Sequence, residues 1–316
     1  MDEMDWDACK DWLNEKDLGR WEADVPMSAY TSWKIGGSAA LMVWPRTEED
    51  VSSILMYCKA NAYPFRILGA GTNLLVADEG IEALVLHTGE LRSVSWEAIP
   101  QRDGQKDQLD TVQVSAGAGV LIARLAEEAA EQSLHGLEFA AGIPGTFGGA
   151  IAMNAGAFGG QISDVLVSVR AMDTEGHINQ YPVQELDFRY RMSSFRFSSL
   201  LILSGILQLT KGDKTSSRTL MREYMDARRT NQPLDLPSAG SVFRNPAGDG
   251  AGRYIDQAGL KGVQAGKAQI SAKHANFIVN LGGAKAAEVK ALMELAQTEV
   301  KRRFGVDLES EIVYWD

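Results

Sequence analysis

Three glycine-rich segments restrict the fold of this chain more than any other feature of its sequence. They run from Gly69 to Asn73, from Gly142 to Gly149 and from Asn154 to Gly160. Glycines gathered in this way are needed where the backbone takes positive φ angles or approaches another group closely. Runs of small residues also present backbone N–H groups to an anion such as a pyrophosphate. Each segment alone also fits a tight turn between strands, but together they favour loops that hold an extended ligand.

The Rossmann dinucleotide-binding pattern is absent from these loops. That pattern requires a third glycine, but Leu74 stands in its place after Gly69–Gly71, as Ile122 does after Gly117–Gly119. An extended dinucleotide still needs several close backbone approaches along its length. Among such ligands, flavin adenine dinucleotide (FAD) fits the three segments best.

Hydrophobic periodicity predicts short helices and strands in an irregular order. Helices are expected near residues 47–61, 120–133, 220–229 and 288–304, and strands near residues 65–68, 81–86, 111–115, 165–172, 200–209 and 276–281. The apolar face of the second helix includes Leu121, Leu125 and Ala129, and a turn at Asp173–Gly176 indicates a β-hairpin. Because the elements do not alternate as regular βαβ units, the pattern predicts an α+β fold rather than a doubly wound one.

The distribution of aromatic and polar residues suggests three parts. Trp6, Trp12 and Trp21 lie among charged residues and indicate a helical N-terminal extension over residues 1–24. The polar, turn-forming stretch Lys211–Ser216 is typical of a linker. We therefore expect one domain over residues 25–211 and a second over residues 217–316.

Charge and composition exclude several classes of partner. A net charge of −11 argues against binding to nucleic acids or to anionic membranes. Only two cysteines are present, and the four histidines have no spacing typical of metal ligands, so we predict no protein-bound metal. No apolar run approaches the length of a membrane span. The simplest expectation is a soluble, cytoplasmic monomer.

Four segments resemble those of the UDP-N-acetylenolpyruvoylglucosamine reductases, the MurB family of peptidoglycan synthesis. They are Thr31–Gly37, Leu68–Leu75, Gly142–Gly149 and Asn154–Ala157, and the resemblance extends from about Val25 to the C-terminus. It implies an FAD-binding domain of the vanillyl-alcohol oxidase (PCMH) type in two subdomains, followed by a C-terminal α+β substrate-binding domain. It also implies non-covalent FAD contacts from Gly69, Ala70, Gly71, Thr72, Asn73 and Leu74, from Gly142, Ile143, Pro144, Gly145, Thr146, Gly148 and Gly149, and from Asn154, Ala155, Gly156 and Ala157.

The resemblance also implies a reaction. NADPH reduces FAD, and the reduced flavin reduces the enolpyruvyl group of UDP-N-acetylglucosamine enolpyruvate to give UDP-N-acetylmuramate. Hydride addition at carbon 3 moves negative charge onto carbon 2 and its carboxylate. The site therefore needs a cation that binds the carboxylate and a proton donor near carbon 2.

Three residues match the family's catalytic positions. Arg191 matches the arginine that stabilises the developing enolate, and its planar guanidinium stays charged and binds carboxylates bidentately. Ser241 matches the serine that delivers the proton, and Glu311 matches the catalytic glutamate near the C-terminus. Taken singly, each also fits an ordinary role as a solvated cation, a turn residue or an edge-strand carboxylate.

The sequence departs from the family pattern beside these residues. Ser310 stands where the family usually has proline, and Glu309 is therefore an alternative to Glu311. Arg189 and Arg196 flank Arg191, but the Tyr190–Arg191 pair is what aligns with the family.

Six further residues match segments that bind substrate in the family, namely Tyr190, Arg244, Asn245, Lys261, Gln269 and His274. A solvated surface charge is the commoner role of a lysine, and His274 fits a core or capping role equally well. No insertion separates Arg191 from the strand that begins at Leu200, which resembles a shorter family form without a tyrosine-bearing loop over the substrate.

Two other functions remain open on the sequence alone. An oxidase of the same fold would return electrons to oxygen, but many such oxidases tether FAD through a histidine, and Phe65–Asn73 contains none. A nucleotide-binding regulator without turnover would use the loops to hold an effector, and Ser241 would then only shape a turn.

Overall fold

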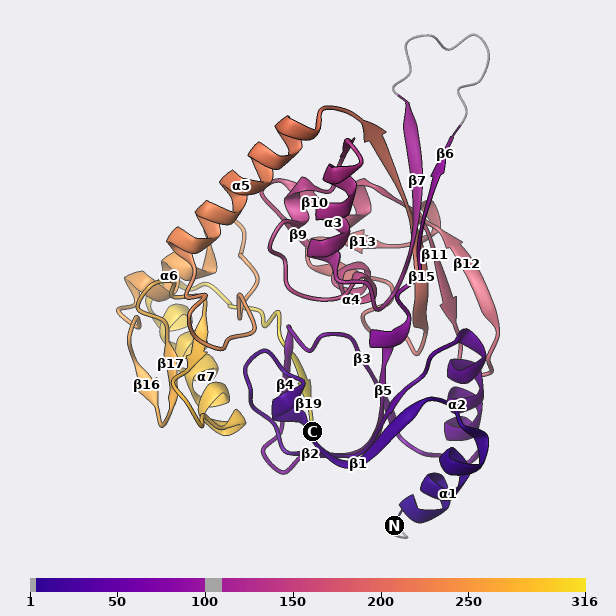
Figure 1. Cartoon of the computed structure of the whole chain (residues 1–316). Helices are drawn as coiled ribbons and strands as arrows, with labels where there is room; N and C mark the ends of the chain where they lie inside the picture. The colour runs from indigo at the N-terminus through magenta and orange to yellow at the C-terminus, as the bar shows by residue number, and fades with distance from the viewer. Residues whose placement is uncertain (1–3, 100–109) are drawn as a thin grey trace. The chain divides into compact units, whose positions relative to one another are not determined.

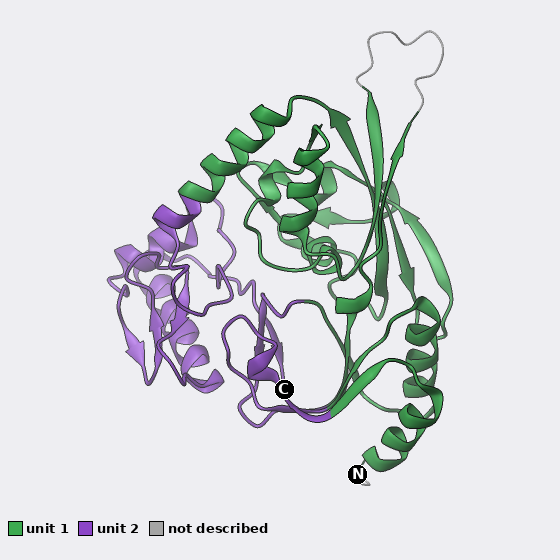
Figure 2. Ribbon diagram, in the orientation of Figure 1, with its two compact units in different colours: residues 1–22, 41–69, 83–226 green, residues 23–40, 70–82, 227–316 purple. Residues whose placement is uncertain are grey.

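The computed structural model describes residues 4–99 and 110–316 (Figure 1). The chain divides into two compact units, each assembled from three separate stretches (Figure 2). Unit 1 comprises residues 1–22, 41–69 and 83–226, and unit 2 comprises residues 23–40, 70–82 and 227–316. The first glycine segment is therefore shared, because Gly69 belongs to unit 1 and residues 70–73 belong to unit 2.

The chain crosses from one unit to the other inside three strands of a four-stranded sheet, namely β1, β2 and β5. The strand order is β1-β2-β5-β3, and β3 runs parallel to β5. The bounds are Arg20–Pro26 for β1, Ser38–Trp44 for β2, Phe65–Leu68 for β3 and Ile81–His87 for β5. The predicted strands near residues 65–68 and 81–86 are confirmed.

Helices α1 (Trp6–Lys16) and α2 (Glu48–Ala60) pack together in unit 1. Trp12 stacks on Tyr57 with ring centroids 3.8 Å apart, and Cys9 of α1 is fully buried. The predicted N-terminal helix is present and packs its aromatic side chains on the body. It is shorter than the expected extension, because strand β1 already begins at residue 20.

An antiparallel sheet forms the centre of unit 1. Its order is β12-β11-β15-β7-β6, and the short strand β8 also pairs with β15. The bounds are Val94–Ala98 for β6, Thr111–Gly117 for β7, Leu134–His135 for β8, Leu166–Met172 for β11, Ile178–Pro182 for β12 and Leu201–Lys211 for β15. Met172 pairs with Ile178 across the turn, which confirms the predicted hairpin.

Helices α3 (Ile122–Glu131) and α4 (Phe147–Ala152) share one hydrophobic core with the apolar side chains of β7, β11 and β15. Leu121 was expected on the buried face of the second helix, but this prediction is wrong. The helix begins one residue later, so Leu121 is the N-cap residue and is 53% exposed, whereas Ile122 is fully buried.

The prediction of a linker at Lys211–Ser216 is also wrong, because most of these residues belong to a strand or a helix. Strand β15 reaches Lys211, and helix α5 begins at Lys214 and runs to Asn231. The Asp213 carboxylate accepts a hydrogen bond from the backbone N–H of Ser216 (2.7 Å), so the polar residues cap a helix instead of forming a linker. The division between the units falls inside α5, after Asp226.

Unit 2 is built around helix α7 (Ala286–Phe304), whose Val289, Leu292, Ala296 and Val300 are buried as predicted. Trp33 is also fully buried there, and its indole N–H donates to the Ile278 carbonyl (2.6 Å). The remaining elements are β4 (Leu74–Val76) parallel to β19 (Val313–Trp315), helix α6 (Ala251–Gln257), and the sheet of β16 (Gln264–Ala265), β17 (Ala268–Ile270) and β18 (Ile278–Asn280). Among the helices of the described ranges, none combines the length and the hydropathy needed to span a bilayer.

Candidate active site

The second glycine segment forms a loop that leads into α4, and it meets the start of the first segment. The Thr146 hydroxyl accepts a hydrogen bond from Gly149 N (3.4 Å) and caps the helix. A Cβ atom on Gly69 would lie 2.4 Å from the Thr146 hydroxyl oxygen, and one on Gly148 would lie 2.8 Å from the Cβ of Ala118. Both glycines therefore permit close approaches that no larger residue allows. Gly69, the first residue of one predicted FAD-binding segment, thus contacts another such segment within unit 1.

The third glycine segment is tied to the hairpin that carries Arg191. Asn154 is buried at a φ of +42°, and its side-chain amide donates to Gln161 Oε1 and to the Arg189 carbonyl, each at 3.1 Å. Its side-chain oxygen accepts from Ser163 N (3.1 Å). The Asn154 side chain, predicted to bind cofactor, thus makes three hydrogen bonds within unit 1. The residues of this segment also form a small hairpin, β9 (Gly156–Ala157) with β10 (Gly160–Gln161).

Arg191 lies at the tip of a second hairpin, between β13 (Phe188–Arg189) and β14 (Met192–Ser193). The turn contains only Tyr190 and Arg191, and Arg191 itself takes a φ of +56°. Tyr190 is 52% exposed, whereas Arg191 is half-buried. The hydroxyl of Ser193 donates to the Ala152 carbonyl at the end of α4 (2.8 Å), so this hairpin is anchored beside the second glycine segment as well.

The alternative arginine, Arg189, is engaged elsewhere. Its guanidinium forms an ion pair with Asp187 at 2.8 Å, and its side chain is 72% exposed. Arg196 donates to the Arg191 carbonyl (3.2 Å) and so supports the turn.

Ser241 and Glu311 lie on neighbouring backbone segments of unit 2. The Glu311 N–H donates to the Val242 carbonyl (2.8 Å), and Phe243 forms an antiparallel bridge with Ser310. Gly240 takes a φ of +76° and turns the chain directly before the serine. Ser241 is half-buried, and within the described ranges its hydroxyl has no hydrogen-bond partner.

The first glycine segment reaches the same place through Asn73. Its side-chain amide donates to the Glu311 carbonyl (2.9 Å), and its carbonyl accepts from Val313 N (3.0 Å). Glu309 is more exposed than Glu311 and lies 3.6 Å from the Arg244 guanidinium. The structure thus brings Asn73, Ser241 and Glu311 together in unit 2, although they are far apart in the sequence.

The predicted substrate-binding residues of unit 2 make local contacts. The Asn245 side-chain oxygen accepts from Ala251 N (3.0 Å), the Gln269 amide donates to the Gly262 carbonyl (3.2 Å), and Lys261 forms an ion pair with Asp256 (2.7 Å). His274 Nδ1 accepts from Asn276 N (3.2 Å). Burial lowers the pKa of His274, and the positive charge of Lys261 lowers it further.

Two functional candidates were missed by reasoning from the sequence. Ser32 donates its N–H to the Gly71 carbonyl (3.1 Å), and its buried hydroxyl oxygen has no partner within the described ranges. The Asn276 side chain accepts from Phe243 N (3.0 Å) and donates to the Phe243 carbonyl (2.8 Å), which holds the extended segment that follows Ser241. Ser32 lies inside the segment Thr31–Gly37, so the resemblance could have identified it. Asn276 had no such signal.

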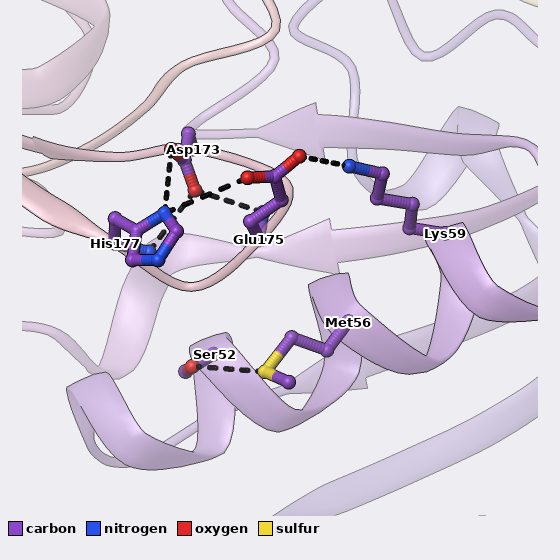
Figure 3. A network of polar contacts seen from close by, with 6 residues as sticks. All are labelled: Ser52, Met56, Lys59, Asp173, Glu175 and His177. Atoms are coloured by element: carbon purple, nitrogen blue, oxygen red, sulfur yellow. Dashed lines mark hydrogen bonds and ion pairs between the residues drawn. The ribbon is translucent and has the colours of Figure 1, made fainter.

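One cluster of metal-type ligands occurs in the part of the chain that the structure describes. Asp173, Glu175 and His177 place ligand atoms within 4.8 Å of one another at the β11–β12 turn (Figure 3). One Asp173 carboxylate oxygen accepts from the backbone N–H groups of Glu175 (2.8 Å) and His177 (3.0 Å), and Glu175 forms an ion pair with Lys59 of α2. These contacts give the cluster a structural role, because they stabilise the β11–β12 turn and hold it against helix α2.

Two family models match separate parts of this chain. Residues 39–180 match a family model described as an FAD binding domain, and residues 232–315 match one described as the C-terminal domain of UDP-N-acetylenolpyruvoylglucosamine reductase. The fold is thus α+β with an FAD-binding domain of PCMH type, as predicted.

Several similar proteins are UDP-N-acetylenolpyruvoylglucosamine reductases. The UDP-N-acetylenolpyruvoylglucosamine reductase of Heliobacterium modesticaldum is 42% identical over 93% of this chain and 90% of its own length. That of Syntrophomonas wolfei is 40% identical over 93% and 94%. The crystal structure of the reductase from Thermus caldophilus is 36% identical, with a TM-score of 0.77 over 94% of this chain and 99% of that one. The chain therefore belongs to the UDP-N-acetylenolpyruvoylglucosamine reductase family of FAD-dependent oxidoreductases.

Proposed function

We propose that this protein reduces the enolpyruvyl group of UDP-N-acetylglucosamine enolpyruvate to give UDP-N-acetylmuramate for peptidoglycan synthesis, with NADPH as the electron donor. Membership of the family supports the substrate class. The observation that carries the assignment is the backbone pairing that brings Ser241, Glu311 and Asn73 together in unit 2. NADPH as the donor and the cytoplasm as the location are parts of the same proposal.

The residues around the glycine segments fit FAD. At Gly69 the Thr146 hydroxyl occupies the space of a Cβ, so the missing side chain lets the first and second glycine segments pack closely together. The buried Ser32 hydroxyl beside Gly71 is a polar atom that a bound phosphate or ring oxygen would satisfy. We propose that Gly69–Leu74, Gly142–Gly149 and Asn154–Ala157 hold the cofactor, mainly through backbone groups. Bound there, FAD supplies hydride-transfer chemistry.

Arg191 is the proposed carboxylate-binding cation. Addition at carbon 3 of the substrate leaves negative charge on carbon 2 and on its carboxylate. A guanidinium that is held by a two-residue turn can bind that carboxylate bidentately and stabilise the charge as it develops. The hydrogen bond from Asn154 to the Arg189 carbonyl fixes the hairpin beside the third glycine segment.

Ser241 is the proposed proton donor. Its hydroxyl follows a glycine turn and is not occupied by a local hydrogen bond, so it is available to protonate carbon 2. We assign to the half-buried Glu311 the return of a proton to the serine. Arg244 and Lys261 are the proposed ligands of the diphosphate, with Tyr190, Asn245, Gln269 and His274 shaping the substrate site.

Substitution of Ser241 by alanine tests this mechanism in anaerobic stopped-flow experiments. We expect flavin reduction by NADPH to stay within about twofold of wild type, and reoxidation by the enolpyruvyl nucleotide to fall by roughly a hundredfold or more, because only reoxidation needs the proton. Ser238→Ala, three residues upstream, is the matched control and should leave both half-reactions intact. Equal losses in the two half-reactions of Ser241→Ala would remove Ser241 from this role.

The same experiment separates the other functions. An oxidase would be reoxidised by oxygen and would ignore the enolpyruvyl nucleotide. A regulator without turnover would stay colourless after FAD is added. Rapid reoxidation by the nucleotide, and slow reoxidation by oxygen, would support the reductase.

A further inference from the structure

One face of helix α5 contacts the flanks of two glycine segments inside unit 1. Ser217, Met221 and Tyr224 are spaced by four and three residues, so they lie along one side of the helix. Ser217 is 1% exposed, Met221 is 8% exposed and belongs to the core, and Tyr224 is half-buried. This face is therefore turned toward the body of unit 1.

The first contact joins α5 to the second glycine segment through Glu138. The Ser217 hydroxyl donates to Glu138 Oε1 at 2.6 Å, and Glu138 begins the short helix η3 (Glu138–Ala140), four residues before Gly142. The carboxylate also accepts from Gly136 N (2.8 Å) and lies 3.0 Å from His135 Nδ1. Its side chain is only 12% exposed. A buried carboxylate with three partners fixes the chain that enters the loop.

The second contact joins α5 to the third glycine segment through Phe158. Its ring stacks on that of Tyr224, with centroids 4.1 Å apart and parallel planes. Phe158 follows Ala157 directly, at the turn of the β9–β10 hairpin, and takes a φ of +53°. A bulky residue rarely adopts this conformation, so the stacked ring gives a physical reason for its presence here.

We infer that this face of α5 supports the flavin site. Glu138 and Phe158 are positioning residues that hold the second and third glycine segments in the conformation that binds FAD. The inference rests on the proposed function, because it takes those segments as the cofactor site. Neither residue is required to touch the cofactor. Each acts through the backbone of the segment that it borders, with Ser217 and Tyr224 as its partners on α5.

The test measures FAD affinity and the visible spectrum of the bound flavin for variants of the full chain. Ser217→Ala should raise the Kd for FAD by about tenfold, because a hydrogen bond to a buried carboxylate is lost. Phe158→Ala and Tyr224→Ala should each raise it by about fivefold, and the double variant should be little worse than either one. Tyr224→Phe keeps the ring and should retain wild-type affinity and the wild-type spectrum.

Glu131→Gln is the matched control. Its carboxylate forms ion pairs with Lys214 (2.6 Å) and Arg218, so it joins the same end of α5 to α3 instead of to a glycine segment. It should leave the Kd within about twofold of wild type. An equal loss in this variant, or unchanged affinity in Ser217→Ala and Phe158→Ala, would overturn the inference.

A second control separates this inference from the proposed function. Gly145 takes a φ of +129°, which alanine cannot adopt without strain, so Gly145→Ala should abolish FAD binding. If this variant loses FAD while the α5 variants bind normally, the inference alone fails. If the wild-type chain takes up no FAD, the proposed function fails and the inference fails with it.

Discussion

The Arg191 hairpin and the Ser241 segment (residues 240–243) are both held at tight turns, but by different means. In the hairpin the arginine itself takes the positive φ, and buried side chains tie the turn to the glycine segments. In the Ser241 segment Gly240 takes the positive φ directly before Ser241, and backbone pairing with residues 309–311 supplies the support. In the hairpin the catalytic candidate Arg191 itself adopts the strained backbone conformation. In the Ser241 segment the neighbouring Gly240 adopts it instead.

The largest expected effect is at Arg191, the proposed carboxylate-binding cation. Arg191→Ala should lower kcat by roughly a thousandfold, because the developing charge on the substrate loses its stabilising cation. Arg189→Ala should change kcat by less than about threefold, since Arg189 already pairs with Asp187. Steady-state kinetics with both variants measures this difference. Comparable losses would place the cation elsewhere on the hairpin.

Substitution of either of the two buried asparagines that support these regions, Asn154 and Asn276, should destabilise the fold by a similar amount. Asn154→Ala and Asn276→Ala should each lower the free energy of unfolding by about 3 kcal/mol, because each leaves backbone groups without partners, part-buried ones around Asn154 and buried ones around Asn276. Urea denaturation measures the loss. We expect Asn154→Ala to weaken FAD binding, and Asn276→Ala to slow mainly the reoxidation by substrate. The opposite pattern would contradict the division of roles.

A smaller effect is expected at the glycine before the serine. Gly240 has a φ of +76°, and no atom lies within 4 Å of the Cβ that an alanine would add. Gly240→Ala should therefore cost only backbone strain, about 1 kcal/mol of stability. Thermal unfolding measures this loss. A much larger loss would mean that the turn is more crowded than the structure describes.

The smallest effect concerns the pH dependence of stability: as the pH falls, the Ser241 segment should be affected before the flavin loop is. The pKa of His274 is lowered below 6.5 by burial and by Lys261, so the unfolded chain binds this proton first. Stability should then fall as the pH drops below about 6.5, because a protonated Nδ1 can no longer accept from Asn276 N. Urea unfolding at pH 7.5 and 5.5 measures this. His274→Gln should flatten the dependence.

Glu138 gives the corresponding expectation for the flavin loop. Burial opposes its ionisation, but hydrogen bonds from Ser217 and Gly136 outweigh burial and lower its pKa below 4.5. Its contribution to stability is present above pH 4.5 and is lost as the pH falls through the lower, folded-state value. Loss of FAD in acid should therefore begin at a lower pH than the change at His274. The reverse order would contradict this comparison.

Local patterns predicted the parts of the molecule that depend on near neighbours. The helix near residues 288–304 and the hairpin around Asp173–Gly176 were found because their periodicity and turn residues are contained in a short window. The start of α5 was missed because the polar residues that cap a helix also occur in linkers. The three contacts of Asn154 were missed because one of its partners, Arg189, is far away in the sequence.

The candidate site was predicted unevenly for the same reason. The resemblance identified Arg191, Ser241 and Glu311 as residues, but periodicity gives no information on the pairing of Val242 with Glu311. The support from Asn276 and from the α5 face is long-range, and it is visible only in the folded chain.

The interleaving of the two units has a consequence for attempts to dissect the protein. A fragment that begins at residue 227 would lack Trp33, whose indole fills the core around Ile278, and strand β4, the partner of β19. Such a fragment should expose apolar surface and aggregate when it is expressed alone. Neither unit can be cloned as a contiguous gene segment. To exchange unit 2 between relatives, residues 23–40 and 70–82 would have to be transferred together with residues 227–316.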